Sequence, residues 1–245
     1  MMLEDAKAAH DREEYATALR LFRLVADQGN ADAQVRLGLM CCKGQGLPQD
    51  YAAAATWYRK AADQGDAYAQ LGLGEMYFLG RGVSQDYAEA VTWLRKAALQ
   101  GNVTAQLSLG SMYEEGQGTP PDYSEAILWY RRAAEQGSAE AQLGLGIMYE
   151  TGNRVPKDFG EAAKWLNKAA EQGHATAQSY FALMFAMAED YVDAYKWYSL
   201  SAVSYPEADT ESRRKAIESR DHVAAKMTST EIAEAKTLAR VWKPK

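Results

Sequence analysis

Residues 66–101 of the chain read DAYAQLGLGEMYFLGRGVSQDYAEAVTWLRKAALQG. In the first half of this stretch the apolar residues fall at the i, i+4, i+7 and i+8 positions that form one face of an α-helix: Ala69, Leu73, Met76 and Tyr77. The second half shows a second helical stripe, which begins at Tyr87 and includes Trp93. Gly80 and Gly82 lie between the halves and supply the positive φ angles that turn a chain. The stretch therefore predicts a helical hairpin with a Gly-x-Gly loop.

The same pattern recurs every 36 residues along the chain. Four residue types keep this step: Gly29, Gly65, Gly101, Gly137, Gly173; Gln34, Gln70, Gln106, Gln142, Gln178; Trp57, Trp93, Trp129, Trp165; and Tyr51, Tyr87, Tyr123, Phe159. A period between 20 and 50 residues indicates supersecondary units that stack on one another. A further glycine recurs inside each first helix, at 38, 74, 110 and 146. Because glycine weakens a helix interior, its recurrence predicts that another helix backbone passes too close for a side chain.

Capping residues mark where the helices begin. The first helices follow Asn30, Asp66, Asn102, Ser138 and His174, and the second helices follow Asp50, Asp86, Asp122, Asp158 and Asp190. Side-chain oxygens at these positions accept hydrogen bonds from the open amides of the first turn, although histidine is a weaker cap. Glu89, Glu125 and Glu161 stand three residues after their aspartate, which resembles a capping box.

The two ends of the chain depart from the repeat. Residues 1–29 match only the second half of the unit, which predicts a shortened first unit with little first helix. The full units follow at 30–65, 66–101, 102–137, 138–173 and 174–202, and the last one lacks the Gly-x-Gly loop. Residues 203–245 carry no repeat and read as two helices, at 210–227 and 231–241, with a capping box at Thr228 and Glu231. We predict that residues 203–245 cap the stack formed by residues 1–202 within the same domain, because an open stack needs a polar end.

The recurring motif resembles the Sel1-like repeat, a relative of the tetratricopeptide repeat, over roughly residues 11–202. The resemblance implies an all-α, right-handed α-α superhelix, or solenoid, and a bacterial protein-interaction scaffold or adaptor. Two residues depart from the motif, since Cys41 replaces a tyrosine and Arg154 replaces the second loop glycine. One cysteine-rich branch of the family is associated with β-lactam hydrolysis, but this chain lacks the paired cysteines in every repeat.

Composition excludes several classes of partner. The chain has 245 residues, 27 Lys+Arg against 33 Asp+Glu, and a net charge of −6, which disfavours binding to nucleic acid. The longest apolar run, residues 180–188, is too short to cross a bilayer, which needs about 20 residues. No signal peptide is apparent, so the sequence as it stands indicates the bacterial cytoplasm, and a removed signal peptide would indicate the periplasm or secretion. The compartment stays undecided.

No catalytic, metal or cofactor site is predicted. Ser212 and Lys215 form a literal Ser-x-x-Lys, but the other β-lactamase motifs are absent, and a solvated charge run is the simpler interpretation. The Gly-x-Gly loops follow helices rather than strands, so we interpret them as turns and not as phosphate-binding loops. His10, His174 and His222 are scattered, and the adjacent Cys41 and Cys42 cannot build a disulfide framework.

The predicted binding surface lies on the first helices, opposite the stripe that packs inward. We call it the first-helix face; it consists of positions 32, 36, 39 and 43 and their equivalents at steps of 36, and we expect it to be concave. Its residues differ between copies, which leaves them free to suit a partner. The predicted contact residues are Arg36, Leu39, Tyr68, Glu75, Leu79, Ser111, Glu115, Glu140, Ile147, Tyr180 and Leu183. Gly72 and Gly144 would deepen this groove.

The favoured function is therefore capture of a protein or peptide segment on the first-helix face. Three alternatives stay open at this point. The apolar residues of the face could simply pack against neighbouring helices. The chain could act on β-lactams or cell-wall fragments as an enzyme, or it could form a homo-oligomer through the groove or through one end of the stack.

Overall fold

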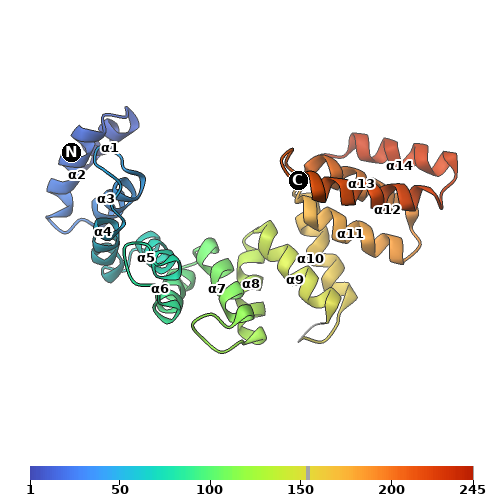
Figure 1. Ribbon diagram of the computed structural model, residues 1–245, viewed down its shortest axis with the longest axis horizontal. Helices are drawn as coiled ribbons and strands as arrows, with labels where there is room; N and C mark the ends of the chain where they lie inside the picture. The colour runs from blue at the N-terminus through green and yellow to red at the C-terminus, as the bar shows by residue number, and fades with distance from the viewer. Residues whose placement is uncertain (153–154, 245) are drawn as a thin grey trace. The chain divides into compact units, whose positions relative to one another are not determined.

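A computed structural model describes residues 1–152 and 155–244, and this part of the chain is helical and contains no strand (Figure 1). The chain forms two compact units, Met1–Trp129 and Tyr130–Lys245. The division falls inside α8 (Tyr123–Glu135), so each unit is described by itself. Arg154, the predicted departure in a loop, lies outside the described residues.

The first unit is a series of packed helical hairpins. Its helices are α1 (Met2–Asp11), α2 (Tyr15–Ala26), α3 (Ala31–Lys43), α4 (Tyr51–Asp63), α5 (Ala67–Leu79), α6 (Tyr87–Leu99), α7 (Val103–Glu115) and the start of α8. The partners within a hairpin pack together, and each second helix also packs on the following first helix: α2 on α3, α4 on α5 and α6 on α7. A helix that lies between two neighbours, such as α3 or α5, therefore buries two sides, as stacked repeats require.

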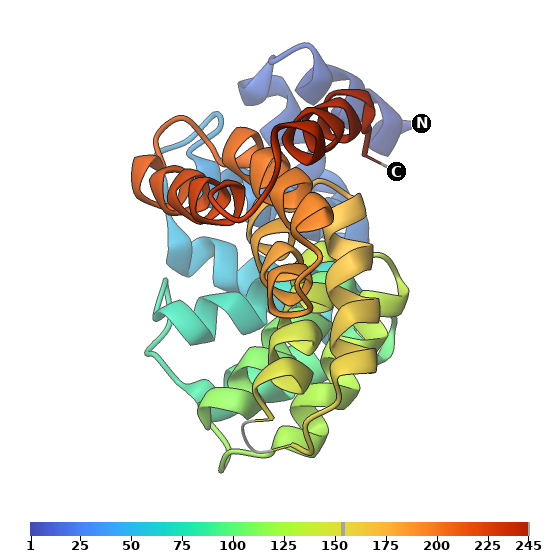
Figure 2. The same ribbon diagram turned by 90° about the vertical axis from the view of Figure 1, so that its right-hand side faces the viewer.

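The second unit continues the same pattern and ends in a different hairpin. It contains α9 (Ala139–Thr151), α10 (Phe159–Glu171), α11 (Ala175–Met187), α12 (Tyr191–Ser204), α13 (Thr210–Ala224) and α14 (Ser229–Val241). The last two helices both pack on α12, and in Figure 2 they run across α11 and α12. The predicted capping box is confirmed, since the Thr228 hydroxyl accepts from the Glu231 amide and the Glu231 carboxylate accepts from the Thr228 amide.

Side-chain caps begin the helices where the sequence predicted them. The N-cap residues Asn30, Asp66, Asn102 and Ser138 accept hydrogen bonds from backbone amides of their helices, and His174 does so through Nδ1. The predicted capping boxes of the second helices form only in part, since each N-cap aspartate accepts from the amide of the glutamate three residues later. The carboxylates of Glu89, Glu125 and Glu161 instead accept from the indole Nε1 of the tryptophan one turn later, at 2.9–3.1 Å. That bond satisfies the polar end of Trp93, Trp129 and Trp165, each at most 5% exposed.

The periodic glutamine connects successive repeats. The Gln34 side chain is 3% exposed, and its Nε2 donates to the Ala26 carbonyl at the end of the preceding α2. Its Oε1 accepts from Nε2 of Gln64, 30 residues later, and the pairs Gln70–Gln100 and Gln142–Gln172 repeat that bond. A buried amide needs such partners, since an unsatisfied polar group costs about 1–3 kcal/mol. The series ends at Gln178, whose buried Oε1 has no partner in the described part of the chain.

The first unit differs from the prediction in one respect. We expected little first helix before residue 15, but α1 has ten residues and packs on α2. Its Ala6 and Ala9 are buried in a core cluster with Phe22. The sequence did not predict this helix because the α1–α2 connection is short and lacks the Gly-x-Gly signature. Glu13 takes the positive-φ position in that connection instead of a glycine.

Candidate functional site

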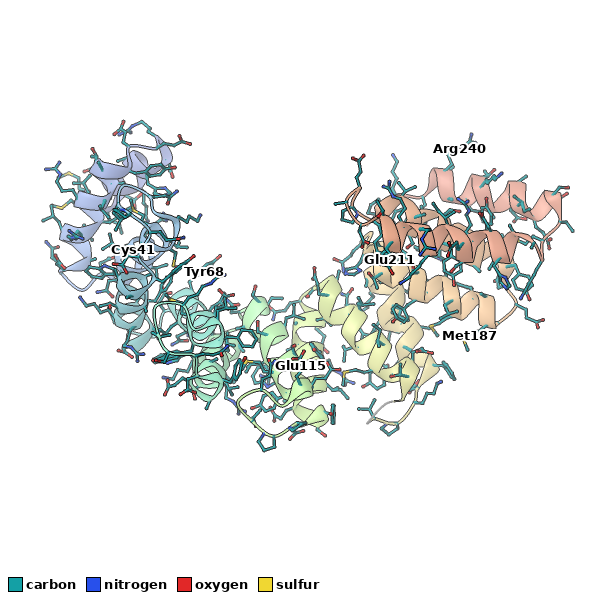
Figure 3. The ribbon with its side chains drawn as sticks, viewed as in Figure 1. Cys41, Tyr68, Glu115, Met187, Glu211 and Arg240 are labelled. Atoms are coloured by element: carbon teal, nitrogen blue, oxygen red, sulfur yellow. The ribbon has the colours of Figure 1, made fainter. Side chains whose placement is uncertain are left out.

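The exposed apolar residues of the first unit include two predicted contact residues on α5. Tyr68 (labelled in Figure 3) projects from the first turn of this helix with 66% of its surface exposed. Leu79, at the last turn, is 50% exposed. Large apolar side chains left in water are a feature of interaction surfaces when they lie beside a pocket. The α5 part of the first-helix face therefore has exposed anchors at both ends.

A pocket of about 270 Å³ lies between α3 and α5, beside Leu79. We call it the α3–α5 pocket. Three predicted contact residues line it, Leu39, Glu75 and Leu79, together with six others: Cys42, Tyr51, Tyr58, Gly72, Met76 and Arg81. These residues come from α3, the start and middle of α4, α5 and the loop after α5. The structure thus brings three of the predicted residues together in one place.

The Tyr58 ring occupies space that two glycines leave beside it. A Cβ atom placed on Gly38 would lie 2.7 Å from this ring, and one placed on Gly72 would lie 3.1 Å from it. Tyr58 itself is only 6% exposed. Gly72 therefore leaves room for the tyrosine ring, and it also lines the α3–α5 pocket. The Gly144 backbone likewise faces the Tyr130 ring, and a Cβ atom placed on Gly144 would lie 3.9 Å from that ring.

The polar groups of the α3–α5 pocket differ in charge and in exposure. Glu75 is exposed, yet desolvation by its surroundings raises the pKa of its carboxyl group. Burial also raises the pKa of the half-buried Cys42 thiol, which is hydrogen-bonded to Tyr58, so this thiol is a poor nucleophile at neutral pH. Burial raises the pKa of Tyr58 as well. The Arg81 guanidinium lies over the Tyr51 ring, 5.6 Å from its centroid.

The other predicted residues of the first unit are held by neighbours on their own helices. Arg36 forms an ion pair with Asp32 at 3.0 Å and lies over the Phe22 ring. The Ser111 hydroxyl donates to Glu115, one turn later on α7, at 3.3 Å. None of these three lines the α3–α5 pocket. They belong to the same predicted face but not to its pocket.

In the second unit, α13 lies beside the predicted residues of α11. Tyr180 and Leu183 line a pocket of about 360 Å³ together with Ser212, Lys215 and Ala216 of α13. A neighbouring pocket of about 460 Å³ shares Leu183 and reaches Met187 at the end of α11. We call the two together the α11–α13 groove. The sequence did not predict that the cap would form one wall of this groove, because residues 203–245 have no repeat to fix their position.

The two remaining predicted residues lie on α9. Glu140 is exposed and accepts a hydrogen bond from the Ser138 hydroxyl at the start of that helix. Ile147 is half-buried. Neither lines the α11–α13 groove. The candidate site of the second unit is therefore narrower than the predicted face.

The family of the chain follows from the repeat. A family model for the Sel1 repeat matches residues 31–66, 67–102, 103–138, 139–174 and 184–202. The chain belongs to the Sel1 repeat family. Its fold is accordingly an all-α solenoid of Sel1 repeats, as the sequence predicted. The family boundaries lie one residue after our predicted units in the first four matches.

Solved structures of other Sel1 repeat proteins are similar to this one. A Sel1 repeat protein from Oxalobacter formigenes is 34% identical with a TM-score of 0.79, over 87% of this chain and 96% of that one. The protective antigen c5321 of uropathogenic Escherichia coli, described as displaying an SLR fold, is 30% identical with a TM-score of 0.75. That match covers 93% of this chain and 56% of the antigen, so this Sel1 repeat protein spans little more than half of its length. No curated protein matches the sequence.

The geometry of the Ser-x-x-Lys pair does not favour catalysis. Ser212 and Lys215 both line the α11–α13 groove rather than a featureless surface. The Lys215 ammonium, however, is paired with the Glu211 carboxylate at 2.6 Å, and both side chains are largely exposed. The lysine of the motif is therefore engaged in a surface ion pair with Glu211 rather than with Ser212. In the described part of this Sel1 repeat protein, no cluster of His, Cys, Asp and Glu could hold a metal ion, and no helix is long and apolar enough to span a bilayer.

Proposed function

We propose that this Sel1 repeat protein is a scaffold that binds an extended or helical segment of another protein on its first-helix face. Repeats of this family are generally protein–protein interaction scaffolds. The observation that carries the proposal is on α5, where the exposed Tyr68 and Leu79 flank a face that also holds the α3–α5 pocket. A segment laid along α5 would cover both apolar side chains and insert one of its own into the pocket.

Two features support binding here rather than on the second helices. The residues of the first-helix face vary between repeats, whereas the buried alanines and tryptophans that join the repeats recur. A pocket lined by first-helix residues occurs in each unit, at α3–α5 and at α11–α13. A solved tetratricopeptide protein, YrrB, is described as having an unusual peptide-binding site; it is 21% identical with a TM-score of 0.50, so the likeness extends to the fold alone.

Peptide selection followed by mutation tests the proposal. The full chain is screened against a random library of 15-residue peptides, and the affinity of the selected peptides is measured by fluorescence anisotropy. Leu79→Ala and Tyr68→Ala should each weaken binding by about tenfold or more, because each removes an apolar contact. Leu99→Ala is the matched control, since Leu99 is 65% exposed but lies on the second helix α6.

The control should bind as the wild type does, and all three variants should keep the wild-type melting temperature. If Leu99→Ala weakens binding as strongly as Leu79→Ala, or if neither changes it, the binding surface is not the first-helix face. Light scattering of the free chain at the same concentrations shows whether the surface is instead covered by a second copy of the protein.

A further inference from the structure

We propose that the α3–α5 pocket accepts a lysine or arginine side chain of the bound segment and that Glu75 is its counter-ion. This inference rests on the function proposed above and names the chemistry that this part of the face selects. Four observations carry it: the register of Glu75 in the repeat, the absence of an ion pair, the lining of the pocket and its size.

The fold does not require a carboxylate at the Glu75 position. The equivalent residues in the other repeats are Leu39, Ser111, Ile147 and Leu183, none of which is charged. A residue needed for stacking recurs at each step, as the buried glutamines do. Glu75 is therefore an addition to this one repeat, on the face where the chain is free to vary. Such an addition is expected where a partner is recognised.

Two opposite charges line the pocket without neutralising each other. Among the described residues, no cation lies within ion-pair distance of Glu75, although Arg81 lines the same pocket. Arg81 instead stacks over Tyr51. An ion pair between an exposed arginine and an exposed glutamate adds at most about 1 kcal/mol to the stability of a protein. Keeping Glu75 and Arg81 apart therefore costs the fold little. It leaves the carboxylate open to a cation from outside, and it leaves the guanidinium able to donate to carbonyl groups of a bound backbone.

The rest of the lining suits the stem of a long basic side chain. Leu39, Met76 and Leu79 offer apolar surface, and Tyr51 and Tyr58 add aromatic rings. Lysine and arginine pack their methylene groups on such surface while the charged end reaches a polar partner. The volume of about 270 Å³ lies just below the range of about 300–1,000 Å³ that is typical of drug-sized ligands. The pocket thus fits one side chain better than a whole small molecule.

The charge of the pocket depends on pH through Glu75. Cys42 and Tyr58, with pKa values raised by burial, are neutral at pH 7, and Arg81 is the other charged group of the lining. Desolvation raises the pKa of Glu75, so this carboxylate loses its charge earlier on acidification than an ordinary glutamate does. Binding of a cation needs the ionised form. The affinity for a basic segment should therefore fall as the pH is lowered toward the pKa of Glu75.

The experiment compares matched peptides on matched variants. In a selected peptide free of histidine, each Lys or Arg is replaced in turn by norleucine, which keeps the apolar stem without the charge. One such replacement should weaken binding to the wild type by about tenfold or more, as expected when a close charge pair loses one partner. Glu75→Gln should remove the difference between the two peptides. Asp63→Asn, which changes the net charge equally at the exposed end of the second helix α4, away from the first-helix face, should preserve it.

The pH profile gives an independent measurement. As the pH is lowered from about 7.5 toward about 4.3, the value of an ordinary glutamate, the wild type and Asp63→Asn should lose affinity for the basic peptide, while Glu75→Gln should lose much less. If the peptides bind through Leu79 but show no basic preference, or if Glu75→Gln leaves the preference intact, the inference is overturned and the proposed function stands. If no peptide binds, or if Leu79→Ala leaves binding unchanged, both the inference and the proposed function are overturned.

Discussion

At the scale of single residues, packing between neighbouring helices decides where the recurring glycines stand. The sequence predicted that a helix backbone approaches each of them. The structure shows that the closest group is usually a side chain. The Tyr58 ring lies against Gly38, and the Leu94 and Leu166 Cγ atoms lie 2.7 and 2.5 Å from where a Cβ atom on Gly74 and Gly146 would be. These glycines make room for a residue of the paired second helix, so their recurrence reflects side-chain volume.

Two glycines of α9 provide a test of this explanation. Gly146→Ala should lower the free energy of unfolding by about 1–3 kcal/mol, because its Cβ would overlap Leu166 in a closely packed core. Gly144→Ala, two residues away, should raise it by up to about 1 kcal/mol, because the nearest Tyr130 atoms are 3.9 Å away and alanine favours the helix. Urea denaturation of both variants measures the difference. Equal effects of the two substitutions would contradict the packing explanation.

The candidate site was partly predictable from single residues. The helical stripe placed Glu75 and Leu79 on one side of α5, because residues four apart share a side of a helix, and the 36-residue step placed Leu39 at the position of α3 equivalent to Glu75; all three line the α3–α5 pocket. Arg81, Tyr51 and Tyr58 were missed as pocket residues, since they come from a loop and from a second helix. The position of Arg81 between two loop glycines, directly after α5, is the one signal that could have placed it there.

At the scale of the elements, the helix starts follow from local sequence, whereas the α1–α2 and α11–α12 connections each hold a glutamate at positive φ. The predicted N-caps hold because an Asn, Asp or Ser side chain reaches its own helix amides without help from tertiary contacts. The α11–α12 connection lacks the glycine loop, and Glu189 there adopts φ 61°. This left-handed conformation costs a residue with a side chain about 1–2 kcal/mol.

Replacement of Glu189 by glycine should stabilise the protein. Glu189→Gly relieves the left-handed strain and loses part of that gain to the entropy of glycine in the unfolded chain, which leaves about 0.5–1 kcal/mol. Ala188→Gly is the neighbouring control, since Ala188 has φ −85° and gains no relief, so it should lower stability. Thermal unfolding followed by circular dichroism separates the two variants. A fall in melting temperature for Glu189→Gly would show that the carboxylate makes a contact worth more than the strain.

At the scale of the whole chain, residues at the very end complete the core of the second unit. Trp242 is half-buried, and its ring meets the Trp197 ring edge-to-face with centroids 5.9 Å apart. Ile232 and Met227 pack on the same cluster. The C-terminal hairpin thus covers the last repeat. In that repeat the Gln178 Oε1 has no counterpart of the glutamine that donates to Gln34, Gln70 and Gln142 in earlier repeats. Whether residues 203–245 belong to one domain with the entire repeat region stays a prediction.

Truncation of this tryptophan should weaken the second unit. Trp242→Ala should lower the free energy of unfolding by about 1–3 kcal/mol, less than a fully buried tryptophan would, because the side chain is half-buried. Val241→Ala, at the adjacent position with 65% exposure, should change it by less than about 0.5 kcal/mol. Hydrogen exchange should show lost protection in α12 and α14 of the Trp242 variant. An unchanged exchange pattern would mean that α14 does not cover the core.

The sequence by itself determined the repeat, its helical hairpins, the caps and the residues that join the hairpins. These features depend on local hydrogen bonds and on a spacing that every copy repeats, so one chain provides several independent instances of each. Tertiary structure alone decided that α1 forms, that α13 borders the Tyr180 and Leu183 surface, and that Glu75 and Arg81 share a pocket without pairing. Those outcomes depend on contacts between residues far apart in the chain, and no periodicity encodes a contact that occurs once.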